Sequence, residues 1–549
     1  MIAPRYSPPR CLFVYPHFTS QSFWNYRATC EVVGAKYPAA PLGLITVAAM
    51  LPPGWEVRLA DLNAEELDGR DVEWADMVFL GGMIAQQPDH LHLIDYFHSM
   101  GKTVVVGGPD ATSSPHLYDK ADHLVLGEAE ITMPQFLADL AKGKAKHSYE
   151  TGGLKAAMAD SPTPRFDLLK FDNYLHVGIQ WNRGCPFMCE FCDIIELFGR
   201  IPRGKSVTQV LAELQRLYEL GYRGHIDIVD DNFIGNKKEV KLLLPHLIQW
   251  LKDHRWPFEF STEASMNLSD DEDLMGLMQE AGFNWLFVGI ENPNEETLKA
   301  TQKRQNTHRS IADSIHKIMR HGMIVNAGYI VGFDGEKGDV AQAILDNIEA
   351  TSVPVNMVGL LFALPNTQLT RRLQKEGRLD ADYEIPPDKT ACQCVAGLNF
   401  STLRPRFDIL RDFRRVVKEA LQPEKYFGRV LRFSLMQDCS KKRLKLPFRH
   451  HLRDIRSLFR LTLRLGVAKE TRLQYWKVLG TCLLRNPRAL RNAISLMALY
   501  LHFGTFRDFV LERLDGELSL LEKEGDPRLR LGSKNSFLGK PKEAVLAAI

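Results

Sequence analysis

The 549-residue sequence has few cysteines and no long apolar run. Its nine cysteines are an odd number spread along the chain, unlike the dense, even pattern of a disulfide-linked secreted protein. We therefore expect a cytoplasmic protein whose thiols are free to bind metal. No segment approaches the ~20 apolar residues of a membrane-spanning helix. The N-terminus also lacks the apolar core of a signal peptide.

Net charge is also nearly absent, but the charges are unevenly distributed. The formal net charge is +2, whereas residues 401–549 hold 32 Lys and Arg against 15 Asp and Glu, which leaves 37 against 52 for residues 1–400. A basic helical surface is most often simply solvated, and the alternative is peripheral contact with an anionic membrane or an acidic partner. We find no nucleic-acid-binding module, so nucleic acid is not an expected partner.

Residues 1–145 alternate short apolar runs with helical patterns, which predicts a doubly wound parallel sheet of α/β class. Ligands of such sheets bind at the carboxyl ends of the strands. Glycines occur at three of these expected ends, and tight turns alone would also explain any single pair. Their repetition along one edge favours a binding site, and the residues are Gly81, Gly82, Gly107, Gly108 and Gly127.

Residues 146–172 are predicted to form a linker, and a strand–helix pattern resumes over 173–400. The expected strands are 175–182, 224–231, 258–265, 285–292, 324–333 and 355–364. Six strands are fewer than the eight of a closed β/α barrel, so we expect a partial, open barrel with its chemistry at the strand ends. Residues 401–549 show no strand pattern and are predicted to form a basic helical domain.

Three cysteines, Cys185, Cys189 and Cys192, follow the first expected barrel strand with the spacing C-x3-C-x2-C. Gly184 and Pro186 flank the first thiol, which indicates a loop. Structural zinc needs four ligands, and no fourth Cys or His lies at a suitable spacing. Three thiolates from one loop instead suit a 4Fe–4S cluster with one iron left open.

This motif resembles that of the radical S-adenosylmethionine superfamily, in which an aromatic residue precedes the third cysteine, as Phe191 does here. The resemblance covers residues 175–400. It implies that S-adenosylmethionine binds the open iron and is cleaved by one electron to a 5′-deoxyadenosyl radical, which abstracts hydrogen from an unactivated carbon. It also implies an electron donor such as flavodoxin or ferredoxin.

The same resemblance assigns roles to residues at the ends of later strands. Asp231 is a candidate for the methionine amino group, and Ser261 and Glu263 for the ribose or carboxylate. Glu291 is an expected polar contact, and Gly332 lies in the glycine-containing strand expected near adenine. Each assignment competes with a simpler one, because a strand-end carboxylate often caps the next helix.

The first domain resembles the cobalamin-binding domain that precedes some radical S-adenosylmethionine barrels. "GGPDATSSP" (107–115) and "LGEAE" (126–130), which contains Glu128, resemble its cofactor-facing loops. The D-x-H-x-x-G motif of many such domains is missing, because "YPHFTSQ" stands in its place. His17 is therefore an ordinary loop residue, and bound cobalamin would lack a protein histidine on its lower face.

With the basic helical C-terminal region, the chain resembles the branch that contains the hopanoid C-2 methylase. The implied activity is C-methylation of a small-molecule or lipid-like substrate by an enzyme that uses the cluster, S-adenosylmethionine and cobalamin. Two alternatives stay open: a cyclase or oxidoreductase with the same cofactors, and a non-enzymatic corrinoid- or cluster-binding protein. Arg200, Arg203 and Lys205, which follow the cysteine loop, either pair with the cofactors or face solvent.

Overall fold

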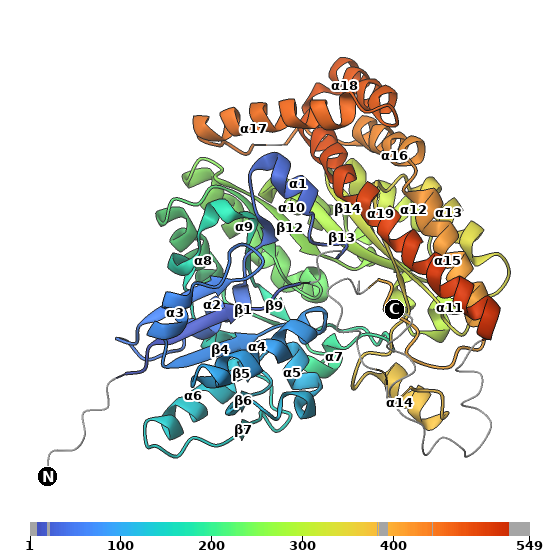
Figure 1. Ribbon diagram of the computed structural model, residues 1–549. Coiled ribbons are helices and arrows are strands. Elements are labelled where there is room, and N and C mark those ends of the chain that lie inside the picture. The colour runs from blue at the N-terminus through green and yellow to red at the C-terminus, as the bar shows by residue number, and fades with distance from the viewer. Residues whose placement is uncertain (1–7, 19–21, 381–382, 384–393, 442, 526–549) are drawn as a thin grey trace, which may run out of the picture.

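The first sheet is parallel throughout and has the strand order β3-β1-β4-β5-β6-β7 in the computed structural model, which describes residues 8–18, 22–380, 383, 394–441 and 443–525 (Figure 1). Buried apolar residues fill its central strands, as a parallel sheet covered on both faces requires. Its strands are β1 (Cys11–Tyr15), β3 (Val57–Asp61), β4 (Met77–Gly81), β5 (Thr103–Gly107), β6 (His123–Val125) and β7 (Ser148–Tyr149). Its helices are α2 (Leu42–Ala48), α3 (Gly69–Trp74), α4 (Gln87–Ser99), α5 (Pro109–Ser113) and α6 (Ala129–Leu140).

The second sheet is the predicted open barrel, with the order β15-β14-β13-β12-β11-β8-β2. The six expected strands are β8 (Tyr174–Ile179), β11 (Gly224–Ile228), β12 (Phe258–Glu263), β13 (Phe283–Glu291), β14 (Ile324–Val331) and β15 (Val355–Leu360). A seventh strand, β2 (Tyr37–Ala39), comes from the first 145 residues and pairs in parallel with β8. Similarly, β7 lies within the segment expected to be a linker and pairs with β6. Each sheet therefore gains a short edge strand from outside its expected segment: the barrel sheet from the first 145 residues, and the first sheet from the expected linker.

Helices α7–α14 belong to the barrel segment, and most of the longer ones begin at a side-chain cap, as their sequences favour. They are α7 (Ile194–Leu197), α8 (Val207–Glu219), α9 (Lys237–Asp253), α10 (Glu272–Ala281), α11 (Glu295–Ala300), α12 (Ile311–Arg320), α13 (Val340–Thr351) and α14 (Gln368–Lys375). The caps are Ser206, Asn236, Asp271, Asn294, Ser310, Asp339 and Thr367. These caps fix the residue at which each of these helices begins.

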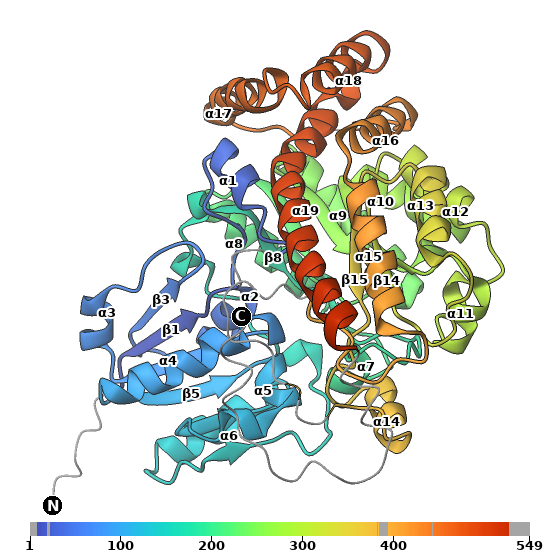
Figure 2. The same cartoon turned by 45° about the vertical axis from the view of Figure 1, so that its right-hand side comes forward.

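The C-terminal region is helical, as predicted. It comprises α15 (Arg406–Ala420), α16 (Pro423–Met436), α17 (Phe448–Leu461), a π-helical turn η9 (Thr462–Gly466), α18 (Arg472–Arg485) and α19 (Leu490–Glu524). The long helix α19 runs along α15, and α1 (Arg27–Val33) from the N-terminal region packs against it (Figure 2). Helices α17 and α18 project at the end of the molecule far from the first sheet (Figures 1 and 2).

Within the part of the chain that the structure describes, one helix, Pro487–Lys523, is long and apolar enough to cross a membrane by length and composition alone. Half of its most apolar window is buried inside the protein. It also holds buried polar side chains with protein partners, because the His502 ring lies 3.1 Å from the carbonyl oxygens of Ser22 and Phe23. These contacts are those of a core helix.

Candidate active site

The three-cysteine loop lies at the carboxyl end of β8 and is closed by a short antiparallel pair. The strands of this pair are β9 (Asn182–Arg183) and β10 (Arg203–Gly204). Gly184 turns the chain into the loop at φ +95°, and a Cβ at that position would lie 2.9 Å from the carbonyl oxygen of Gly199. Only glycine fits there without strain. All three cysteines carry free thiols.

Two adjacent carboxylates hold the start of this loop. The backbone N–H groups of Trp181 and Asn182 donate to Oδ1 of the buried Asp230, at 2.8 and 3.0 Å. The N–H of Gly184 donates to Oδ2 of Asp231, at 3.2 Å. Burial raises the pKa of Asp231 to about 6. The residue predicted to accept the methionine amino group thus also positions the cysteine loop.

The surroundings of the thiols fit an iron–sulfur cluster. Among the described residues, no three His, Cys, Asp or Glu side chains, the three cysteines included, are already arranged as ligands of a single metal ion. Amide groups point at the sulfurs instead: Nδ2 of Asn232 lies 3.8 Å from Sγ of Cys185, and Nε2 of Gln305 lies 3.6 Å from Sγ of Cys189. Such donors stabilise the sulfur ligands of a cluster.

A buried cation lies beside the loop. Nζ of Lys303 pairs with Oε1 of Glu291 at 2.7 Å and lies 5.9 Å from the centre of the Phe191 ring. Burial lowers the pKa of Lys303, but the Glu291 carboxylate and the nearby thiols outweigh this effect, so the net shift is upward. Lys303 therefore stays charged and places positive charge beside the three sulfurs. Glu291, predicted as a polar contact for the cofactor, already has this protein partner.

The other predicted strand-end residues have varied surroundings. Ser261 hydrogen bonds to Asp227 and lies 2.8 Å from Nε2 of His225, so it belongs to a polar cluster inside the barrel. Glu263 has an exposed side chain at the end of β12, but the surrounding protein desolvates it and neighbouring carboxylates repel its charge, which together raise its pKa to about 8. The N–H of Gly332 donates to the Glu336 carboxylate at 3.0 and 3.1 Å. A Cβ on Gly332 would lie 2.7 Å from Leu398.

A cavity of about 460 Å³ lies along the glycine-rich edge of the first sheet. All six residues predicted there, Gly81, Gly82, Gly107, Gly108, Gly127 and Glu128, line it. Gly108 adopts φ +95°, and a Cβ would lie 3.2 Å from the backbone nitrogen of Gly82, so the edge is open only because side chains are missing. Apolar residues such as Phe13 and Phe79 form the floor. This cradle fits a large, flat cofactor such as cobalamin.

No histidine lines this cavity among the described residues. His17 is instead at the surface, where its Nδ1 lies 3.4 Å from Oδ2 of Asp89. The prediction that His17 is an ordinary loop residue agrees with this placement.

Ion pairs at the rim of the cavity join the two α/β domains. Glu128 pairs with Arg183 at 3.1 Å and with Arg203 at 2.8 Å, and Glu130 pairs with Arg183 at 2.8 Å. Arg203 therefore has a carboxylate partner in the first domain, and Lys205 forms a buried pair with Glu213. Because Arg183 immediately precedes Gly184, these pairs tie the cysteine loop to the edge of the first sheet.

A second cavity, of about 250 Å³, opens at the barrel mouth. Phe191 and Glu291 line it on the barrel side, together with Gly328 and Ile330 from β14. Its other wall is apolar and comes from the first domain, through Ile84, Ala85 and Pro88. Asp231, Ser261, Glu263 and Gly332 line neither this cavity nor the glycine-edged one.

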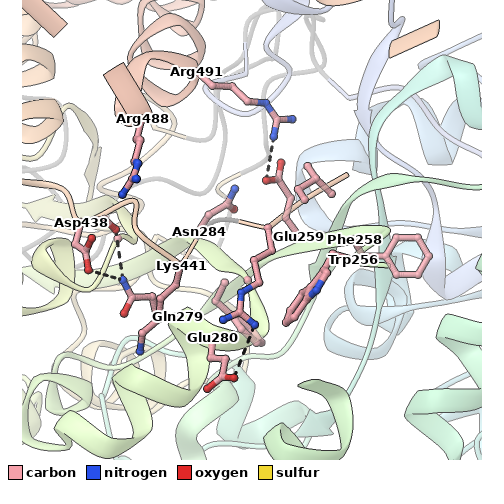
Figure 3. Close-up of a pocket in the computed structure, with 15 residues that line it drawn as sticks. Trp256, Phe258, Glu259, Gln279, Glu280, Asn284, Asp438, Lys441, Arg488 and Arg491 are labelled. Atoms are coloured by element: carbon pink, nitrogen blue, oxygen red, sulfur yellow. Dashed lines mark hydrogen bonds and ion pairs between the residues drawn. The ribbon is translucent and has the colours of Figure 1, made fainter. Parts of the chain in front are cut away.

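A third cavity, of about 200 Å³, lies at the opposite, amino-terminal end of the barrel strands (Figure 3). Its lining mixes cations such as Arg488 with carboxylates such as Glu259, which pairs with Arg491 at 3.3 Å. Active sites of β/α barrels lie at the other end of the strands. This cavity is therefore a gap between barrel and helical domain, away from the cysteines.

Sequence reasoning missed the residues that reach the site from outside the strand ends. Lys303, Gln305 and Asn232 contact the cysteine loop, and three residues border the apolar cavity: Ile84 and Ala85 of η1 (Ile84–Gln86), and Pro88. Of these residues, Asn232 was the easiest to predict from the sequence, because it directly follows Asp231. Lys303 and Gln305 occur in an ordinary polar stretch after α11, without any distinguishing pattern.

Comparisons with known proteins agree with this architecture. Residues 30–137 match the B12 binding domain, residues 179–348 the Radical SAM superfamily, and residues 367–515 a domain of unknown function, DUF4070. The fold is similar to that of the cobalamin-dependent radical enzyme OxsB with aqua-cobalamin and S-adenosylmethionine bound. That similarity has a TM-score of 0.58 at 15% identity, over 94% of this chain and 81% of that one.

Two relatives match nearly the whole chain. An uncharacterised methyltransferase of Synechocystis sp. is 42% identical, over 93% of this chain and 94% of its own length. The hopanoid C-2 methylase of Rhodopseudomonas palustris is 32% identical, over 90% of this chain and 92% of its own. The chain therefore belongs to the radical S-adenosylmethionine methyltransferases with an N-terminal cobalamin-binding domain, in the branch that contains the hopanoid C-2 methylase.

Proposed function

We propose that the protein methylates an unactivated carbon of a lipid-like substrate, with a hopanoid-type polycyclic lipid as the leading candidate. The observation that carries this proposal is the apolar cavity at the barrel mouth. It is bounded on one side by Phe191 of the cysteine loop and on the other by residues of the cobalamin-binding domain. A substrate in this cavity would lie between the two cofactor sites, shielded from water.

The proposal assigns each cofactor to residues of this chain. Cys185, Cys189 and Cys192 would hold the cluster, and Asp231, Glu263 and Glu291 would contact S-adenosylmethionine. The glycine edge, Gly81–Gly82, Gly107–Gly108 and Gly127, receives cobalamin. When bound, these cofactors supply hydrogen abstraction and a transferable methyl group. The chain itself orients them, because Asp231 and the Arg183 ion pairs fix the loop between the two sites.

The amide donors of Asn232 and Gln305 and the charge of Lys303 would stabilise the negative charge of the thiolates. Ser261, held by His225 and Asp227, would act on the shape of the barrel interior more than on the cofactor directly. We further propose that the division into residues 1–145, 173–400 and 401–549, joined by 146–172, separates cobalamin binding, radical chemistry and substrate presentation.

A test is to incubate anaerobically reconstituted protein with methyl-deuterated S-adenosylmethionine, cobalamin, an electron donor such as flavodoxin or ferredoxin, and a bacterial lipid extract. The proposal expects a lipid whose mass rises by one deuterated methyl group in place of hydrogen. A product lacking the added carbon would favour a cyclase or oxidoreductase instead. Label only in a water-soluble product would contradict the lipid-like substrate. A lipid substrate also implies that the enzyme works at a membrane surface.

A further inference from the structure

Helix α17, the turn η9 and Val467, which directly follows η9, expose a continuous row of apolar side chains. Leu452, Ile455, Phe459, Leu463 and Val467, here called the apolar stripe, are 50–65% exposed. Their spacing of three or four residues places them on one side of a helix. The opposite side is the packed one, because Leu461 and Leu465 are buried. The stripe therefore faces away from the protein. A contiguous exposed apolar surface of this kind marks a site of interaction with a membrane or another molecule.

Arginines flank the apolar stripe along its length. Arg453, Arg456, Arg460 and Arg464 each follow a stripe residue by one position, which turns them about 100° around the helix. Arg464 pairs with Glu31 of α1 at 3.3 Å. Arg456 is exposed and has no ion-pair partner among the described residues. An apolar stripe with cations along its side is the pattern of helices that lie in the interface of a bilayer.

Helix α18 repeats this arrangement beside η9. Leu473, Trp476 and Leu484 are 73%, 52% and 85% exposed, while Tyr475 and Cys482 on the other side are buried. Trp476 Nε1 donates to the carbonyl oxygen of Gly466 at 3.0 Å, which places this indole next to the end of the stripe. Tryptophan is enriched at the level of lipid headgroups. Lys477, which is exposed, extends the row of cations.

The charge of this segment argues against pairing with a second copy. Residues 448–485 contain nine Lys and Arg against two Asp and Glu. Two copies joined through this surface would bring like charges together, which is unfavourable. An anionic lipid surface instead complements the charge and receives the apolar side chains.

We propose that α17, η9 and α18 dock the enzyme onto anionic lipid membranes through the apolar stripe, Leu473, Trp476 and Leu484. This surface stands on its own side chains and does not depend on the identity of the methylated substrate. It is connected to the barrel, because Arg460 and Arg464 hold α1. The segment before α1 places Trp24 against Phe287 of β13, at a ring distance of 5.6 Å. Docking would therefore affect the position of α1 and of the segment before it, which reaches the barrel interior through Trp24.

The test is cosedimentation of the full-length protein with vesicles of phosphatidylcholine alone, or of phosphatidylcholine mixed with phosphatidylglycerol. We expect binding to the mixed vesicles that weakens as salt is added. The double variant Ile455→Glu with Phe459→Glu should abolish it. Arg456→Gln with Lys477→Gln should weaken it by about thirtyfold, because each cation near an anionic surface strengthens binding by roughly fivefold.

Matched controls come from α9, which carries exposed residues of the same types. Leu242→Glu, at a side chain 62% exposed, and Lys238→Gln should leave vesicle binding unchanged. Circular dichroism and light scattering of each variant would confirm its fold and oligomeric state. Equal binding of the stripe variants and the parent, or no binding to mixed vesicles, would overturn the proposal. So would a dimer that the stripe variants split into monomers without any vesicle binding.

Discussion

At the scale of single residues, the glycine edge of the first sheet makes the most specific prediction. Gly108→Ala adds a Cβ about 3.2 Å from the backbone of Gly82, at a φ of +95° that alanine adopts only with strain. We expect cobalamin affinity, measured by absorbance titration, to fall by at least about tenfold, since the edge that receives the cofactor closes or shifts.

Gly101→Ala is the matched control for that substitution. Gly101 also has a positive φ, +68°, but a Cβ there would meet no atom within 4 Å, and it lies far from the cavity lining. Its variant should lose some stability and keep cobalamin affinity. Equal losses of affinity in both variants would mean that backbone strain, and not the shape of the edge, explains the result.

A buried histidine of the same domain gives a prediction about pH. His90 on α4 is fully buried, both of its ring nitrogens lack partners among the described residues, and desolvation lowers its pKa to about 3. The unfolded chain binds this proton near pH 6.5, so stability is lost as the pH falls below that value. The loss amounts to roughly 2 kcal/mol between pH 8 and pH 5.

His90→Phe keeps a ring of similar size against Tyr118 and removes the titrating group. Chemical denaturation at pH 8 and pH 5 should show a smaller decrease in unfolding free energy for this variant than for the parent. If the unfolding free energy of the parent and of the variant fell equally between pH 8 and pH 5, the claim that His90 is buried in its neutral form would be wrong.

Residue-level prediction from sequence worked where a residue type has one main structural use. The glycines at three strand ends do line one cavity, because only glycine leaves a sheet edge open. It was less informative for carboxylates, whose partners depend on tertiary contacts. Asp231 contacts the cysteine loop, Glu291 pairs with Lys303 and Ser261 joins His225 and Asp227, and no spacing in the sequence indicates these partners.

At the scale of elements, the contact between the first sheet and the β9–β10 pair is the critical one. Glu128→Ala would remove the carboxylate partner of Arg203 and one of the two carboxylate partners of Arg183. The side chains of these arginines are only 19% and 11% exposed. Arg183 keeps Glu130, so we expect the lower end of the range for a broken buried pair, roughly 3 kcal/mol in unfolding free energy.

Asp95→Ala breaks the exposed pair with Lys120 and is the control, with an expected cost below about 1 kcal/mol. Denaturant unfolding of both variants measures the difference. A Glu128→Ala cost as small as that of Asp95→Ala would show that the pairs at the cavity rim do not join the domains.

The order of elements was predictable from sequence, but the short edge strands β2 and β7, and the sheets that they join, were not. Buried apolar runs separated by capped helices indicate parallel strands, and all six barrel strands lie where the pattern places them. Strands β2 and β7 have three and two residues, too few for any periodicity. Their pairing is set by the packing of the two sheets, so sequence alone could not reveal that residues 37–39 complete the barrel sheet.

At the scale of the whole molecule, two α/β domains and a helical domain surround one contiguous working region. The glycine-edged cavity, the cysteine loop and the apolar cavity all lie between the first sheet and the barrel mouth. The basic charge of the C-terminal region was visible in the sequence, but its exposed apolar stripe was not, because only the packing of α17 shows which of its two sides is buried.

The central claim is that Cys185, Cys189 and Cys192 hold a cluster that starts radical chemistry. The most direct measurement is iron content together with 5′-deoxyadenosine formation, after anaerobic reconstitution with S-adenosylmethionine and a reductant. The account predicts four irons per chain for the parent and for Cys482→Ala, a buried cysteine far along the chain, both with 5′-deoxyadenosine formed. It also predicts loss of both signals in Cys185→Ala, Cys189→Ala and Cys192→Ala. Parent protein without bound iron, or cysteine variants that still form 5′-deoxyadenosine, would contradict it.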